Sequence, residues 1–595
     1  MNSTVDLNLL SLTEPSDGLF RETVWKNRSQ RRDQEFFIKL QSLYENQQGS
    51  VLKSKPASGI DLYHDLVVRH LPAANNRAAL LYRALDYSPA KFRDFRSESA
   101  KSSLGMCALS YAELHESCTE RCRRWQAIGL KEGDSLCIVS GVEPELFIAL
   151  LSAFRLGLQV TVLPPYGPAF LGNRLAVLDK VKISALARYE TLLRSFQKDC
   201  LFVEKLPNPH RISSTPVSSV TYNKEHPVLA LFSPFCRFGK EPKPNIVDAV
   251  GLFCHLLRDG LVPLALFPGA ILAAPGCDPL QYLPSLFLCT LFHGATYLHL
   301  GLSDLLTEGV MERPNPCVDI LVICRELRDV ILDQSRLDAR VSTGFARRCV
   351  LDAMSRTSTR WDDFAKKMRL TGVPCSTLLF DAGAGGGLLF SKTQLSSFPR
   401  YLEIALGSPI GLERPGSPSE NATPGSIAIF DSHSPGCGIL LSCEDAGLLY
   451  CGTMEPSCEG KPYPKEEVCR VVSELPFVVD CAVFCDVGDR GHTSLLVFTG
   501  PEPIELARAW ETQRIKLIRE LITQKLHVSA LPVLVELFAM YPRRQGPTID
   551  LVWCEREYVR GALRTRETDP MYRGFDGLRA TYIPKHKSGK LEGSK

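Results

Sequence analysis

A strand, a helix and a second strand follow one another closely in this chain, and no other feature constrains its fold as strongly. Residues 135–140 form a short apolar run. Residues 143–156 carry apolar side chains at helical spacing and end at Gly157, and residues 159–163 form a second apolar run. Two strands joined by a helix within ~30 residues are typical of a parallel βαβ unit, because parallel strands need a crossover connection, usually a helix. We therefore predict an α/β fold built on parallel sheets with helices on their faces.

The length and the distribution of polar residues predict several domains. A chain of 595 residues is too long for one hydrophobic core and favours three or four domains. Stretches rich in Pro, Ser and Asn indicate linkers near residues 205–227 and 411–425. The predicted organisation is a polar extension, mobile or packed at the periphery, over 1–57, a large domain over 58–455, a small α+β domain over 456–583 and a basic tail over 584–595.

The composition argues against several classes of protein. The chain has 69 basic and 66 acidic residues, a net charge of +3, which gives no electrostatic reason to expect a nucleic-acid partner. No apolar run reaches ~20 residues without interruption, so we expect no transmembrane segment. The 21 cysteines show no CxxC spacing, so we predict neither a zinc site nor a disulfide framework. Their odd number, with no export signal, predicts free thiols in the cytoplasm.

Three motifs within residues 109–165 follow one another in a fixed order. They read LSYAEL, then GLKEGD, then PELFIALLSAFRLG. They resemble the opening of the acyl-adenylate-forming (AMP-binding) superfamily, which contains acyl-CoA synthetases, adenylation domains of peptide synthetases and fatty-acyl-AMP ligases. YPKEEV at residues 463–468 and LPFVVDCAVF at residues 475–484 are similar to the start of the family's small lid domain, most of all in fatty-acyl-AMP ligases. Residues 558–572 are similar to the end of the fatty-acyl-AMP-ligase-like domains of the disco-interacting protein family.

The resemblance covers roughly residues 60–580 and implies an architecture. It implies a large N-terminal adenylate-forming domain of layered parallel-type sheets and helices. A small β-barrel-like segment and a C-terminal α+β lid domain would follow. The motifs that carry chemistry in this superfamily can then be compared one by one.

The loop that holds the ATP phosphates in this superfamily reads TSGTTGxPKG. The matching residues 231–244 read LFSPFCRFGKEPKP, in which proline and bulky side chains replace the small hydroxyl residues. Such residues cannot wrap closely around a triphosphate, because the backbone amides of a phosphate nest must reach the oxygens. The remnants of this loop are Ser233, Arg237, Gly239, Lys240 and Lys243.

The motif YGxTE, whose acid helps to hold magnesium in the family, is also altered. Residues 380–387 read FDAGAGGG, without the Thr-Glu pair, and Asp381 is the nearest carboxylate. A glycine-rich turn between strands allows a ligand to approach the backbone, although an ordinary turn at a strand end explains the same residues. The candidate pocket residues are Asp381, Gly383, Gly385 and Gly386.

The segment that matches the family's ribose-binding and hinge residues is also altered. Residues 444–453 read EDAGLLYCGT, so Thr453 stands where the family has arginine, and no TGD sequence precedes it. The remnants of this site are Asp445, Gly452 and Thr453.

The lysine that the family uses in catalysis has two candidate positions. YPRRQGPTID at residues 541–550 resembles LPRTPNGKID, and a gap-free match places Thr548 at the lysine. IPKHKSGK at residues 583–590 offers Lys590 instead, but this match requires a long insertion before it.

Four altered motifs on a retained scaffold favour a degenerate fatty-acyl-AMP ligase or acyl-CoA synthetase. Such a protein would bind an acyl chain, or an acyl group on a carrier protein or coenzyme A, without efficient ATP-dependent adenylation. One alternative is an active ligase of lipid or secondary metabolism that forms acyl-AMP and then a thioester, with ATP, magnesium and Lys590 or Lys243. Another is an ATP-independent acyl transferase with Cys236 as its nucleophile. The degenerate protein would need no cofactor, whereas the active ligase would need ATP and magnesium. The sequence leaves open whether the chain is an enzyme.

Overall fold

The computed structural model divides the chain into two compact units, and each is described by itself. The first unit contains Met1–Pro435 and Ser442–Tyr450, and the second contains Gly436–Leu441 and Cys451–Lys595. The structure describes residues 37–38, 40–46, 51–55, 58–74, 77–83, 106–165, 168–178, 180–196, 198–207, 217–232, 244–277, 279–300, 318–324, 327–328, 331, 346–352, 364–368, 370, 372–391, 393–395, 402–405, 410–413, 426–432, 438–444, 447–456, 462–484, 493–526, 531–545, 548–559, 561–568 and 572.

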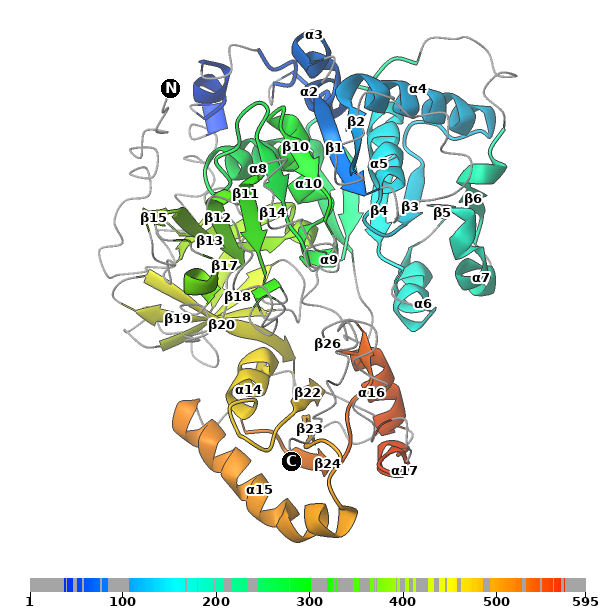
Figure 1. Cartoon of the computed structure of the whole chain (residues 1–595). Coiled ribbons are helices and arrows are strands. Elements are labelled where there is room, and N and C mark those ends of the chain that lie inside the picture. The colour runs from blue at the N-terminus through cyan, green and yellow to red at the C-terminus, as the bar shows by residue number, and fades with distance from the viewer. Residues whose placement is uncertain are drawn as a thin grey trace, which may run out of the picture. The chain divides into compact units, whose positions relative to one another are not determined.

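The predicted strand–helix–strand unit is present in the first unit (Figure 1). Helix α5, Pro144–Leu156, connects β3, Ser135–Val139, to β4, Gln159–Leu163, and the two strands are parallel. Gly157 ends the helix in the left-handed conformation, with φ +77°, which favours glycine. The parallel α/β fold predicted from this segment is therefore confirmed.

The first sheet of this unit has six strands in the order β6-β5-β3-β4-β7-β8. All neighbours are parallel except β7 and β8, which form an antiparallel pair at the edge. The connection between this pair contains the residues matched to the phosphate loop. The remaining strands are β5 (Lys182–Ala185), β6 (Cys200–Phe202), β7 (Pro227–Leu231) and β8 (Asn245–Asp248).

The second sheet has ten strands, nine of them in the order β16-β14-β13-β12-β11-β9-β10-β1-β2, while β15 pairs with β13. Its centre, from β13 to β1, is parallel, and its edges are antiparallel. The strands are β1 (Ala78–Arg83), β2 (Met106–Ser110), β9 (Ile271–Ala273), β10 (Thr296–Leu298), β11 (Val318–Ile323), β12 (Ala346–Asp352), β13 (Pro374–Asp381), β14 (Gly386–Phe390), β15 (Gln394–Leu395) and β16 (Glu403–Ile404).

Both sheets are buried on two faces, as parallel sheets usually are. On β3, Leu136 and Ile138 join a core that includes residues of both sheets, whereas Cys137 and Val139 face a separate cluster with α6. The shared core also receives side chains of α4, α5, α8 and α10. The helices of this unit are α2 (Leu62–Leu66), α3 (Leu71–Ala74), α4 (Tyr111–Ala127), α6 (Pro168–Val177), α7 (Glu190–Leu193), α8 (Ala249–Leu261), α9 (Pro279–Tyr282) and α10 (Ser285–Phe292).

The described part of the predicted polar extension contributes to this core. Residues 37–38 and 40–46 are helical, and Leu40, Tyr44 and Leu52 are buried. The Tyr44 hydroxyl donates a hydrogen bond of 2.9 Å to the carbonyl of Phe292. Apolar residues at helical spacing within a polar segment explain this packing.

A five-stranded sheet follows, in the order β17-β18-β19-β20-β21, where the sequence predicts a β-barrel-like segment, and its outer pairs β17/β18 and β20/β21 are antiparallel. The boundary between the two compact units falls within its strands β19 and β20. The domain limits predicted from the sequence remain predictions. The strands are β17 (Ile410–Glu413), β18 (Ser426–Ser432), β19 (Gly438–Glu444), β20 (Gly447–Pro456) and β21 (Pro462–Pro464).

The second unit contains the predicted α+β module (Figure 1). Its sheet has the order β22-β23-β24, with an antiparallel and then a parallel pair. Side chains of α14 and α15 cover one face, and those of α16 and α17 cover the other. The elements are α14 (Lys465–Val472), β22 (Asp480–Phe484), β23 (Ser494–Phe498), α15 (Ile504–Lys525), β24 (Leu534–Phe538), β25 (Arg544–Gln545), β26 (Thr548–Ile549), α16 (Leu551–Val559) and α17 (Leu563–Arg566).

Among the described residues, no helix combines the length and the apolar character that crossing a membrane requires.

Candidate functional site

The glycine-rich turn lies beside the strands that flank the segment matched to the phosphate loop. A short 3-10 helix, η12, Ala382–Ala384, connects β13 to β14 and contacts both β7 and β8. The turn therefore lies next to both strands of this edge pair. In open α/β sheets, ligands usually bind at the carboxyl ends of the strands, where β13 and β7 end. We take this region of the first unit as the candidate site.

The side chain of Asp381 bonds to the backbone two residues further along the chain. Its side chain is fully buried and accepts a hydrogen bond of 2.8 Å from the N–H of Gly383. It thereby caps η12, as aspartate commonly does at the start of a turn. A carboxylate in this position is not exposed to a metal ion.

A buried ion pair on α8 forms hydrogen bonds to the backbone at the end of the turn. Arg258 and Asp259 are both fully buried, and Arg258 Nε donates to Asp259 Oδ1 at 2.7 Å. The other carboxylate oxygen, Oδ2, accepts the N–H of Gly387 at 2.7 Å, while Arg258 Nη2 donates to the Gly387 carbonyl. The pair therefore binds both backbone groups of one glycine, which satisfies the charges that burial would otherwise penalise.

His255 extends this network toward η12. Arg258 Nη2 lies 2.9 Å from His255 Nδ1. Arginine can only donate, so Nδ1 accepts and the ring proton is on Nε2. Burial and the charge of Arg258 hold the pKa of His255 well below its usual range, so the ring is neutral.

The side chains of α8 approach the turn so closely that two of its positions have room only for glycine. Gly385 has φ +91°, and a Cβ atom there would lie 2.9 Å from His255 Cδ2. Gly386 has φ +157°, and a Cβ atom there would lie 2.2 Å from Asp259 Oδ2. Both positions combine a backbone conformation that favours glycine with close approach of another group. Internal packing thus accounts for this glycine cluster.

The Gly386→Ala substitution should lower the free energy of unfolding of the first unit by about 2–3 kcal/mol more than Gly133→Ala. The added methyl group would displace the Asp259 carboxylate from the Gly387 N–H. Gly133 is the matched control because it has φ +84° but no atom within 4 Å of an added Cβ. Urea denaturation of both variants measures the difference. Equal losses would show that the Asp259 contact is not as close as described.

Aromatic and polar side chains line the adjacent strand ends. Tyr282 of α9 stacks on Phe380 of β13, with ring centroids 5.6 Å apart. Its neighbour Gln281 donates to Asp352, the last residue of β12, at 3.2 Å. An aromatic stack and a polar pair therefore lie at the ends of the strands next to the turn.

The structure places only part of the predicted site. Asp381, Gly383, Gly385 and Gly386 are brought together in the turn described above. Gly452 and Thr453 lie on β20, and Thr548 lies on β26, which pairs with β25. The predicted residues outside the described part of the chain are Ser233, Cys236, Arg237, Gly239, Lys240, Lys243, Asp445 and Lys590.

The sequence analysis did not identify His255, Arg258 or Asp259. One signal was available, because these residues are the polar positions of an otherwise apolar stretch, FCHLLRDGL, and are spaced three and four apart. Such spacing places them on one helical face. Only the fold shows that this face meets the glycine-rich turn.

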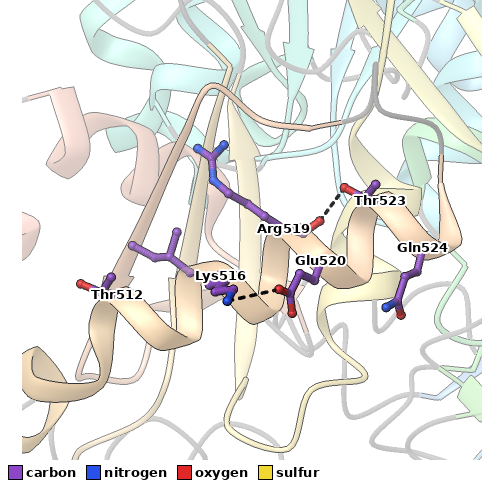
Figure 2. A pocket seen from close by; sticks show the side chains of 7 residues that line it. Thr512, Lys516, Arg519, Glu520, Thr523 and Gln524 are labelled. Atoms are coloured by element: carbon purple, nitrogen blue, oxygen red, sulfur yellow. Dashed lines mark hydrogen bonds and ion pairs between the residues drawn. The ribbon is translucent and has the colours of Figure 1, made fainter.

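A separate hollow lies on α15 of the second unit (Figure 2). Residues of a single helix line it, and two pairs of these residues interact with each other. Lys516 pairs with Glu520 at 3.8 Å, and the Thr523 hydroxyl donates to the Arg519 carbonyl at 2.8 Å. No residue predicted for the site lines this hollow.

Within the described part of the chain, no cluster of three or more His, Cys, Asp or Glu side chains is arranged to hold a metal ion. The cysteines described there are free thiols, and most of them are buried.

The fold is that of adenylate-forming enzymes, as the sequence predicts. No protein-family model matches the sequence, and no curated protein matches it either. The solved structures that match include an anthranilate CoA ligase, an acetoacetyl-CoA synthetase and a fatty acyl CoA synthetase from Mycobacterium tuberculosis.

Three of these structures illustrate the similarity. Acetoacetyl-CoA synthetase from Streptomyces lividans matches with a TM-score of 0.60 and 12% identity, over 94% of this chain and 93% of its own. McyG A-PCP, complexed with phenylalanyl-adenylate, matches with a TM-score of 0.61 and 14% identity, over 86% and 84% of the two chains. O-succinylbenzoate coenzyme A synthetase from Bacillus subtilis, in complex with AMP, matches with a TM-score of 0.57 and 11% identity, over 87% and 99%. Structural similarity at such low sequence identity establishes the fold alone.

Proposed function

We propose that this protein uses the adenylate-forming fold to bind an acyl chain, carried by coenzyme A or an acyl carrier protein, and does not adenylate it efficiently. The observation that carries the proposal is the state of Asp381. Asp381 is the carboxylate nearest to the position where the family has its metal-holding acid, and its side chain is buried and bonded to Gly383. The residues described at this position do not fit a magnesium ion, which requires accessible oxygen ligands in octahedral geometry.

The altered motifs support the same proposal. Thr548 stands at the position of the family's lysine in the gap-free match, and Thr453 at that of its hinge arginine. Loss of one preorganised charge typically lowers turnover by orders of magnitude. The retained fold supports an acyl ligand, because the similar structures include acyl-CoA synthetases and an adenylate complex. A cytoplasmic location and a role in lipid or secondary metabolism are part of the proposal and come from the sequence.

ATP–pyrophosphate exchange with a panel of fatty acids tests the absence of adenylation. We expect turnover at least about 10³-fold below the ~10 s⁻¹ that is typical of enzymes. The Lys590→Ala variant should behave like the unaltered protein. Exchange at an ordinary enzymatic rate, lost in Lys590→Ala, would instead establish the active ligase.

Equilibrium binding tests the ligand. Palmitoyl-CoA should bind to the full chain more tightly than ATP, AMP or coenzyme A alone, as measured by isothermal titration calorimetry. Tight binding of ATP and no binding of palmitoyl-CoA would contradict the proposed function.

A further inference from the structure

Two cysteine thiols from neighbouring elements meet in the second unit. Cys469 lies on α14 and Cys481 on β22, and this helix packs against this strand (Figure 1). The Sγ atom of Cys481 lies 3.4 Å from the carbonyl oxygen of Cys469. Because that oxygen is two bonds from its own Cα, the sulfur lies no more than roughly 6 Å from the Cα of Cys469. A disulfide joins residues whose Cα atoms are about 4.4–6.8 Å apart, so this approach is close enough for a covalent link.

A serine hydroxyl fixes the two cysteines relative to each other. Ser473 Oγ donates a hydrogen bond of 2.7 Å to the carbonyl of Cys469 and lies 3.6 Å from Cys481 Sγ. The hydrogen bond between the two thiols, followed by burial, raises the pKa of Cys481 well above its usual range, and the Ser473 hydroxyl opposes this rise. The end of α14 and the start of β22 are therefore held together by contacts that involve both thiols.

The two thiols differ in their accessibility to a solute. Cys469 is partly exposed, whereas only 7% of Cys481 is exposed. A small oxidant can therefore reach the sulfur of Cys469 first, and the sulfur of Cys481 lies behind it. A reactive, accessible cysteine with a second cysteine close by is the usual arrangement of a redox-sensitive pair.

A second pair of neighbouring thiols, in the first unit, lacks this access. Cys349 of β12 and Cys375 of β13 are partners in register on parallel strands. Adjacent strands are about 4.8 Å apart, so these residues are also close enough to be linked. Their exposed fractions are 0% and 1%. This pair is the matched internal control for the effect of accessibility.

We propose that Cys469 and Cys481 form a redox-active dithiol, which a low-molecular-weight disulfide oxidises to an intramolecular disulfide. The Cys469 thiolate attacks one sulfur of the small disulfide, whose S–S bond breaks and releases one thiolate. Cys481 then gives up its proton, and its sulfur attacks Cys469 Sγ and displaces the second small thiolate. Each released thiolate takes up a proton. One small disulfide is thus reduced to two thiols, while two protein thiols are oxidised to one disulfide.

The link would join the last turn of α14 to the first strand of the three-stranded sheet, across a separation of 12 residues. In a reducing compartment the pair stays as thiols, and the link forms only when small disulfides accumulate. The dithiol is therefore a modification site of the second unit. Its chemistry does not depend on the acyl ligand of the proposed function.

Mass spectrometry of the oxidised full chain tests the link. The folded protein is incubated with glutathione disulfide, the remaining thiols are blocked with iodoacetamide, and the protein is digested with trypsin. Cleavage after Arg470 separates Cys469 from Cys481, so the link joins two peptides, and fragment ions distinguish Cys481 from Cys485 on the same peptide. We expect the link between Cys469 and Cys481 in most of the molecules, with both thiols restored by dithiothreitol.

Controls and variants separate this reaction from unfolding. The buried pair Cys349 and Cys375 should be oxidised at least about tenfold less, because glutathione disulfide cannot reach it in the folded chain. In Cys481→Ala the reaction should stop at the mixed disulfide, with one glutathione retained on Cys469. In Cys469→Ala, Cys481 should stay reduced.

Three results would overturn the inference. One is a mixed disulfide on Cys469 of the unaltered protein without the internal link, and another is a link from Cys469 to Cys485. The third is no reaction at Cys469 under conditions that oxidise a small dithiol. Equal oxidation of Cys349 and Cys375 would attribute the link to opening of the fold and would overturn it as well. None of these results affects the proposed function, which binding and exchange experiments test.

Discussion

Replacing Arg258 by methionine should lower the free energy of unfolding of the first unit by about 3–5 kcal/mol, which is the usual effect of removing one partner of a buried ion pair. The side chain is fully buried, and its Nε bonds to Asp259. Burial already raises the pKa of Asp259, and Arg258 opposes this effect. Without the guanidinium, the carboxylate must stay buried without its counter-charge or take up a proton. The loss is measured by urea denaturation, followed by circular dichroism.

Two further variants test this cause. Arg194→Met removes an arginine whose side chain is 73% exposed and pairs with Glu190 at 3.6 Å, so it should change stability by less than about 1 kcal/mol. Arg258→Met combined with Asp259→Leu should be less destabilising than Arg258→Met alone, because no uncompensated charge remains. If the double variant is the less stable of the two, the charge argument is wrong and the polar contacts to Gly387 dominate.

Lowering the pH from 7 to 5 should destabilise the first unit by about 4 kcal/mol through two buried histidines, His70 and His293, in addition to the contribution of His255, whose pKa is also depressed. Burial lowers the pKa of His70 and of His293 from 6.5 to about 3, and the charge of Arg69 acts in the same direction on both. Both rings also have a nitrogen with no hydrogen-bond partner among the described residues, Nε2 in His70 and Nδ1 in His293. The folded state therefore keeps both rings neutral.

The sign follows from proton binding. Between pH 6.5 and 3 the unfolded chain binds protons on these rings and the folded chain does not, so stability is complete above pH 6.5 and falls as the pH decreases. Each ring contributes about 2 kcal/mol at pH 5. Urea denaturation between pH 7 and 5 measures the slope. His293→Asn should reduce the loss of stability between pH 7 and 5 by about 2 kcal/mol, and a slope unchanged in this variant would exclude the ring as the cause.

The sequence predicted the parallel architecture because local patterns encode it directly. Alternating short apolar runs, the helix over 143–156 and its terminal Gly157 lead to β3, α5 and β4 with little ambiguity. At the start of α4, Ser110 and Glu113 form a capping box, which depends on residues only three positions apart. In these segments the residues that make contact are close in the chain, so spacing is informative.

The candidate site could be predicted only in part. The glycine-rich turn was identified as a place where a ligand could approach the backbone, whereas the structure fills that space with His255 and Asp259. These residues lie more than 120 positions earlier in the chain, at a separation of 128 for Gly387 and Asp259. No periodicity links such segments, because their contact depends on how α8 packs against β14.

The amino-acid sequence by itself determined the class of fold, and it predicts the loss of the residues that the superfamily uses for phosphate, metal and ribose, since both depend on residue type and local spacing. Only the tertiary structure decided what occupies the glycine-rich turn. A glycine permits close approach by a ligand or by another side chain of the same protein. The burial of Arg258 and Asp259 next to Gly387 shows that in this chain the approaching groups are its own.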